Sequence, residues 1–172
     1  MADPVTIERS RERRQLAVTA ALRRHGEPLP APERVEDFGE FFARFGDARI
    51  VLGACSNIQD NSLLLTDSVR GDLVIGERVT FGHNVRMSSG EIGDDALVGM
   101  MAIVGEHVVV ERGGCIAAGA WVEPGTVVRA GWIWAGRPAR AFREVKPQER
   151  EIFARGVDVY VGYGRAYLAA AG

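Results

Sequence analysis

Large apolar residues recur at a step of six through the middle of the chain, and this repeat constrains the fold more than any other feature. A helical face repeats every ~3.6 residues and a strand every ~2, so neither alone sustains such a step over roughly eighty positions. A solenoid does, if three short strands form each triangular coil and the apolar residue points inward. The recurring residues are Leu52, Ile58, Leu64, Ile75, Phe81, Met87, Ile92, Val98, Val104, Val110, Ile116, Val122, Val128 and Trp134.

Two steps depart from six. Between Leu64 and Ile75 the stretch "LTDSVRGDL" is too long for a corner and predicts a loop outside the prism, and between Met87 and Ile92 the step is five. The inward residue is most often followed by glycine or a polar residue, and we expect the glycines to permit tight corners between faces. Fourteen inward positions, at three per coil, predict between four and five coils.

The flanks of the repeat predict helices. A short prism exposes unpaired strand edges at both ends, and each end requires a cap. Residues 146–172 carry an apolar stripe after Pro147, which predicts a helix along the prism. Residues 1–48 are predicted to form a helical segment that caps the first coil. The expected fold is therefore all-β with helical flanks, with a parallel β-helix over residues 49–145.

Composition excludes several classes of protein. The net charge of -2 gives no pull toward nucleic acid or an anionic membrane. The sequence contains neither an apolar run of about 18 residues nor the apolar core of a signal peptide, so we expect a cytoplasmic protein. Cys55 and Cys115 lack CxxC spacing and are expected to be small core residues rather than a disulfide or a zinc site.

Three motifs carry a resemblance to a known family. They are "SNIQDNSLLL" from Ser56, "IGERVTFGHNVRM" from Ile75 and "WAGRPARAFREV" from Trp134. With these motifs, residues of about 49–168 resemble the gamma-class carbonic anhydrases and their hexapeptide-repeat relatives. The resemblance implies a left-handed prism and a homotrimer. It also implies a zinc ion held by three histidines between subunits, where bound water attacks carbon dioxide.

Only one of the three family histidine positions holds a histidine here. The positions fall on Leu65, His83 and Ser88. Leucine has no lone pair, and a neutral hydroxyl is a poor ligand for zinc. Spread over four ligands, the ~10 to 16 kcal/mol of a complete structural zinc site is ~3 to 4 per ligand, so two losses predict no functional occupancy. We therefore expect a degenerate metal site and an inactive protein or scaffold, with no cofactor, and zinc only if the site is unorthodox.

Other family positions are retained. By the resemblance, Asn57, Gln59 and Asp60 belong to the site, and Gln59 and Asp60 would orient bicarbonate or the metal-bound water. Tyr160 matches a tyrosine of the closing helix that overhangs it. The structural alternative for the first three is a polar ladder at the subunit interface, and for Tyr160 it is packing.

Two active alternatives remain open. The first is carbon dioxide hydration through an unorthodox site, with His83 and Gln59 as direct ligands. The second is acyl transfer, the other common activity of hexapeptide prisms, in which His83 or His107 acts as general base on an acyl-CoA bound between subunits. The fold alone does not choose between them.

A second, weaker resemblance covers residues 18–53. This stretch is similar to the lead-in of the erythromycin-esterase-like hydrolases. The catalytic part of those enzymes does not follow, because the chain continues into "ACSNIQD". We therefore infer no esterase activity, and the sequence resembles a junction of two unrelated pieces, natural or constructed.

Overall fold

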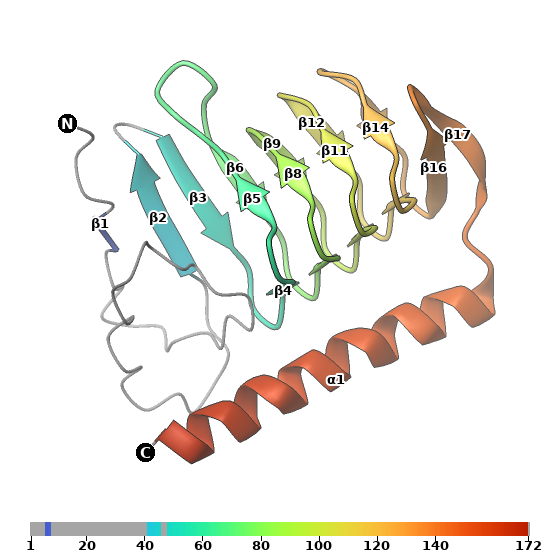
Figure 1. Cartoon of the computed structure of the whole chain (residues 1–172). Helices are drawn as coiled ribbons and strands as arrows, with labels where there is room; N and C mark the ends of the chain where they lie inside the picture. Colours follow the sequence, from blue (N-terminus) through green and yellow to red (C-terminus); the bar gives the residue numbers. More distant parts are fainter. Residues whose placement is uncertain (1–5, 8–40, 46–47, 172) are drawn as a thin grey trace.

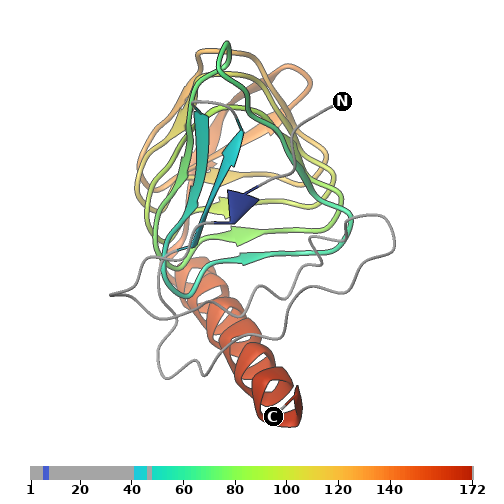
Figure 2. The same ribbon diagram turned by 90° about the vertical axis from the view of Figure 1, so that its left-hand side faces the viewer.

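The chain forms a three-sided prism of short strands with one long helix beside it. A computed structural model describes residues 6–7, 41–45 and 48–171 (Figure 1). Three sheets enclose the prism, and Figure 2 shows its triangular outline. The strands that form the three faces pair in parallel from coil to coil, as the repeat predicts, and the fold is the left-handed parallel β-helix that the family resemblance implies.

Each face of the prism is one sheet. The first contains β3 (Ala48–Leu52), β6 (Leu73–Ile75), β9 (Gly90–Ile92), β12 (Val108–Val110) and β15 (Val127–Val128). The second contains β4 (Asn57–Ile58), β7 (Thr80–Phe81), β10 (Leu97–Val98), β13 (Cys115–Ile116) and β16 (Trp132–Gly136), followed by antiparallel β17 (Ala139–Glu144). The third contains β5 (Leu63–Leu64), β8 (Arg86–Met87), β11 (Ile103–Val104) and β14 (Trp121–Val122). Five, five and four strands correspond to the predicted four to five coils.

The predicted inward residues form the core. All fourteen belong to one apolar cluster, in which Ile58, Leu64 and Trp134 are partly buried and the others are buried. A second buried set was not predicted and lies two residues before an inward position, on the same side of the extended backbone. Its members are Ile50, Leu73, Val79, Val85, Ala96, Ala102, Val108 and Ala120.

The repeat glycines have a different role from the one expected. Gly53, Gly76 and Gly99 do not have positive φ angles; the left-handed residue comes two positions later, as at Cys55 and Met101. A Cβ built on Gly99 would lie 2.4 Å from the backbone nitrogen of Ala118 in the next coil. These glycines are therefore required by the close approach of the neighbouring coil rather than by the corner's backbone conformation.

The predicted loop is present. Residues 65–72 leave the prism between β5 and β6 and protrude beyond the sheets (Figure 1). Asp67 accepts hydrogen bonds from the backbone amides of Val69 (3.0 Å) and Arg70 (2.8 Å) and pairs with the Arg70 guanidinium. These contacts depress the pKa of the Asp67 carboxyl, with the Arg70 amide as the largest cause.

The helical prediction for the N-terminal segment is wrong where the structure describes it. Thr6–Ile7 (β1) and Phe41–Phe45 (β2) are strands. β2 pairs antiparallel with β3 over five residues, from Phe41 opposite Leu52 to Phe45 opposite Ala48. The open edge of the first coil offers unpaired backbone groups, and satisfying them outweighs a local helical pattern. Residues 8–40, which include most of the stretch resembling esterase lead-ins, lie outside the described residues.

The predicted C-terminal helix is confirmed. α1 (Pro147–Ala171) begins at the expected proline and runs along the prism (Figure 1). Glu149 in its first turn accepts the backbone N–H of Lys146 at 2.9 Å. Phe153 packs against a small cluster of Cys115, Ile133 and Val145. In the described part of the chain, α1 lacks the apolar content needed to cross a membrane.

Candidate functional site

The family positions Asp60 and His83 meet at the corner between the second and third sheets. The corner of one coil hydrogen-bonds to the next, with Asn84 N 3.0 Å from Asp60 O and Met101 N 2.8 Å from His83 O. This stacking brings His83 Nδ1 to 3.5 Å from Asp60 Oδ2. Both side chains face solvent, with 40% of His83 and 69% of Asp60 exposed. An imidazole beside a carboxylate can accept a proton, provided that a substrate reaches the corner.

Leu65 and Ser88 lie at a different corner from His83. Leu65 follows β5 and Ser88 follows β8, so these two are neighbours in adjacent coils, whereas His83 precedes β8. The width of the third sheet therefore separates His83 from the other two positions within one chain. Zinc accepts nitrogen ligands at about 2 Å, so the three positions could share an ion only across two chains.

The donor set does not fit zinc within one chain. Across residues 6–7, 41–45 and 48–171, no group of three or more His, Cys, Asp or Glu side chains could hold a metal. At the three family positions, one imidazole is joined by an alkyl side chain and a hydroxyl. The side chains at these positions therefore do not fit a catalytic metal ion within one chain.

Asn57 and Gln59 form a polar ladder on the second sheet. Asn57 Nδ2 donates to Thr80 Oγ1 at 2.9 Å, and Gln59 Nε2 donates to Asn57 Oδ1 at 3.4 Å. Asn57 is only 3% exposed, so these bonds satisfy an amide that burial would otherwise penalise. These bonds lie within a single chain, and the position of the ladder at a subunit interface stays a prediction. A role in orienting bicarbonate stays a prediction.

Tyr160 lies on α1 and stacks edge-to-face on Tyr163, with ring centroids 5.9 Å apart at 84°. Such a pair contributes to packing, which is the alternative that the sequence left open for Tyr160. Its position over a substrate stays a prediction.

The cysteines differ in burial. Cys115 is 4% exposed, as expected for a core residue, whereas Cys55 is partly exposed and occupies a corner with φ 58°. Burial, assisted by the charge of Glu149, raises the pKa of the Cys115 thiol to about 11.

His107 has φ 57° and is the corner residue that its position in the repeat predicts.

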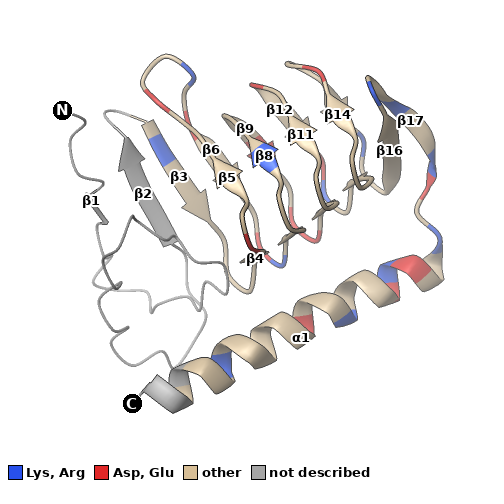
Figure 3. Ribbon diagram, in the orientation of Figure 1, with Lys and Arg blue, Asp and Glu red and all other residues tan. Residues whose placement is uncertain are grey.

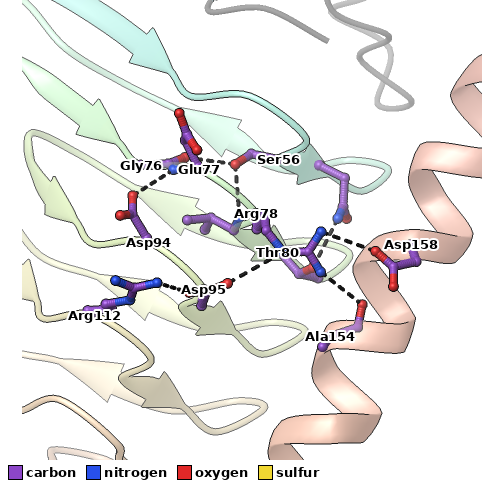
Figure 4. A network of polar contacts seen from close by, with 12 residues as sticks. Ser56, Gly76, Glu77, Arg78, Thr80, Asp94, Asp95, Arg112, Ala154 and Asp158 are labelled. Carbon is purple, nitrogen blue, oxygen red and sulfur yellow. Dashed lines mark hydrogen bonds and ion pairs between the residues drawn. The ribbon is translucent and has the colours of Figure 1, made fainter. Parts of the chain in front are cut away.

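A charged network beside α1 was not predicted from the sequence (Figure 4). Arg78 lies 3.5 Å from Asp95 and 3.1 Å from Asp158 of α1, and Arg112 lies 3.0 Å from Asp95. These residues are 17 and 80 positions apart along the chain. Charges at the outer corners of a repeat resemble ordinary surface charges, and only the coil spacing brings them together.

The hexapeptide repeat, the parallel prism and the closing helix define the class as left-handed β-helix proteins. A scan against models of protein families finds no match. A solved structure, described as a hexapeptide transferase family protein from Anaplasma phagocytophilum, superimposes with a TM-score of 0.64 at 37% identity, covering 67% of this chain and 68% of that chain.

Two curated relatives come from Arabidopsis thaliana. Gamma carbonic anhydrase 1, mitochondrial, is 34% identical over 130 residues, and gamma carbonic anhydrase 2, mitochondrial, is 32% identical over 125. The alignments cover 72% and 70% of this chain but 47% and 45% of those proteins, so the chain spans about half their length. The chain belongs to the gamma-carbonic-anhydrase-like hexapeptide-repeat proteins.

Proposed function

We propose that this chain is a gamma-carbonic-anhydrase-like trimer with a degenerate metal site, which serves as a scaffold and does not hydrate carbon dioxide. One observation carries the proposal. Leu65, 44% exposed, and Ser88 occupy the corner where the family places two histidines, and His83 lies across the third sheet from them. Even where two chains meet, a single imidazole ligand binds zinc too weakly to hold the ion.

The outer face of the third sheet supports self-association. Outward positions of its four strands align as Leu63, Arg86, Ile103 and Trp121. Figure 3 shows β5, β11 and β14 without charged residues and a basic stretch on β8, the strand that contains Arg86. Leu63 is 42% exposed and Trp121 37%, and Met100 and Met101 at the adjoining corner are also exposed. Contiguous exposed apolar side chains mark an interaction surface, and the family's trimer supplies the occupant.

The test combines three measurements on protein purified without a histidine tag. We expect a solution mass of three chains, zinc well below one ion per chain, and carbon dioxide hydration no faster than for His83→Ala. Stoichiometric zinc together with hydration lost in His83→Ala would overturn the degenerate site. A mass of one chain, 18.7 kDa, would instead remove the trimer.

Acyl transfer is the second candidate. The pairing of His83 with Asp60 at 3.5 Å favours it, since a carboxylate can orient a general base, and the solved relative bears the name of a hexapeptide transferase family. Acetyl-CoA at about 100 times its dissociation constant should then raise the unfolding free energy by about 2.7 kcal/mol. An unchanged thermal midpoint at saturating acetyl-CoA would reject this candidate.

A further inference from the structure

A groove lies between α1 and the outer face of the second sheet. Its volume is about 340 Å³, and neither His83 nor Gln59 lines it. One part of its wall is apolar, formed by the chain at β10, by the residue that follows β17 and by α1. These apolar residues are Ala96, Leu97, Val145, Phe153, Ala154 and Val157.

Three arginines line the same groove: Arg78, Arg112 and Arg150. Asp95 bridges the first two, with Oδ1 3.5 Å from Arg78 Nε and Oδ2 3.0 Å from Arg112 Nη2. Arg78 also reaches Asp158 at 3.1 Å (Figure 4). Two carboxylates therefore face three guanidinium groups.

Arg150 provides the excess positive charge. Within the described residues its guanidinium has no ion-pair partner. It lies over Gly131, where a Cβ would come 2.9 Å from Arg150 Nη2. Of the two acidic residues beside it in the sequence, Glu149 is engaged by Arg143 at 2.7 Å and Glu151 lies 3.8 Å from Arg155. One guanidinium is therefore available at the groove, with its donors unassigned.

We propose that this groove binds a small carboxylate with an apolar tail. The carboxylate would take the planar donors of Arg150, assisted by Arg112, because a guanidinium matches a carboxylate with two parallel hydrogen bonds. The tail would lie on Leu97, Phe153 and Val157. A single uncompensated charge favours a monoanion over a phosphate dianion, and the volume is at the small end of ligand sites, which span about 300 to 1,000 Å³.

This binding site is independent of the metal positions. It lies on the second sheet beneath α1, whereas Leu65 and Ser88 lie at the ends of strands in the third sheet. The site requires neither zinc nor carbon dioxide chemistry. A result that disproves the proposed scaffold function therefore leaves this site unaffected, and the reverse also holds.

The test measures hexanoate binding to the full chain by calorimetry. We expect Arg150→Gln to weaken binding by at least about tenfold, the usual consequence of losing a charge-assisted hydrogen bond. Arg155→Gln is the matched control, since Arg155 lies on the same helix, is 75% exposed and pairs at 3.8 Å with Glu151. Equal affinity in Arg150→Gln and wild type, or equal losses in the two variants, would overturn the proposal.

Two further arms fix the ligand chemistry. Hexanamide, which has the same tail without the charge, should bind at least about tenfold more weakly than hexanoate. Tighter binding of hexyl phosphate than of hexanoate would contradict the assignment to a monoanion. Ala154→Phe fills the groove from the exposed helix and should abolish hexanoate binding without lowering the thermal midpoint. Retained hexanoate affinity in folded Ala154→Phe would place the ligand elsewhere.

Discussion

Arg49 on β3 and Asp72 at the end of the protruding loop form a three-donor contact. Arg49 Nε and Nη2 lie 3.1 and 2.7 Å from Asp72 Oδ2, and the Arg49 backbone N–H donates to Oδ1 at 2.9 Å. The contact holds the end of the loop against β3, the first strand of the prism. It also lowers the pKa of the Asp72 carboxyl, chiefly through the side-chain hydrogen bonds of Arg49.

Asp72→Asn should destabilise the protein modestly. The amide keeps one acceptor but loses the charge, and a partly exposed ion pair of this kind contributes about 0.5 to 1 kcal/mol. Denaturation in urea measures the change. Glu91→Gln on neighbouring β9 is the control, and equal midpoints for the two variants would show that the contact contributes nothing.

The Glu149 carboxylate should make the free energy of unfolding depend on pH in the acid range. Hydrogen bonds from Arg143 above all, and then from the Lys146 amide, lower its pKa from 4.5 to about 2. The folded state then binds fewer protons than the unfolded state between these values, so the stabilisation is complete above pH 4.5 and is lost as the pH falls toward about 2.

Urea unfolding of Glu149→Gln and wild type at a series of pH values tests this. The gap between the two unfolding free energies should close across that window. Glu151→Gln is the control, because the Glu151 carboxylate is exposed and lies 3.8 Å from Arg155. A gap that stays constant down to pH 2 would contradict the assignment.

Cys115 should resist alkylation in the folded protein. The thiolate is the reactive form, and a pKa of about 11 leaves almost none of it at neutral pH, while burial blocks the reagent. Mass spectrometry after iodoacetamide treatment should find one label per native chain, on the partly exposed Cys55. Denaturant should add a second label, and Cys115→Ser should remain at one. Labelling of native Cys115 at the rate of Cys55 would disprove the burial argument.

Restoring two ligands should create a zinc site between chains. In Leu65→His/Ser88→His the new imidazoles share one corner, and His83 lies at the other corner of the third sheet, so an ion needs His83 from a second chain. We expect about one zinc per chain, with binding confined to the associated form. The same double variant carrying His83→Ala is the matched control. Equal zinc uptake by both proteins would contradict the inter-chain geometry.

Alanine at two glycines should have opposite effects. Gly99→Ala places a Cβ 2.4 Å from the Ala118 backbone nitrogen and should cost about 1 to 3 kcal/mol or more. Gly156 lies in α1, and a Cβ built on it would have no neighbouring atom within 4 Å. Gly156→Ala should therefore stabilise the protein by about 0.5 to 1 kcal/mol. Thermal denaturation distinguishes the two variants. Destabilisation by both substitutions would contradict the difference in crowding between Gly99 and Gly156.

Much of the prism could be predicted from the sequence, because each face of a triangular coil turns a large apolar residue inward at the same place in every turn. That restriction appears directly as the six-residue step, and residues such as Ile75, Phe81 and Val98 lie in the core where it placed them. The closing helix could also be predicted, since its start depends on Pro147 and the residues beside it. The assignment of Leu65, His83 and Ser88 to the family's three histidine positions followed from the resemblance alone.

Tertiary structure alone decided the rest. Phe41–Phe45 is a strand because the first coil has an edge to satisfy, a demand that does not appear in those five residues. The separation of His83 from Ser88, and the meeting of Arg78 with Asp158, depend on how coils stack and where α1 lies. Local sequence sets which side chains face inward, whereas contacts between distant residues arise only when the whole prism has formed.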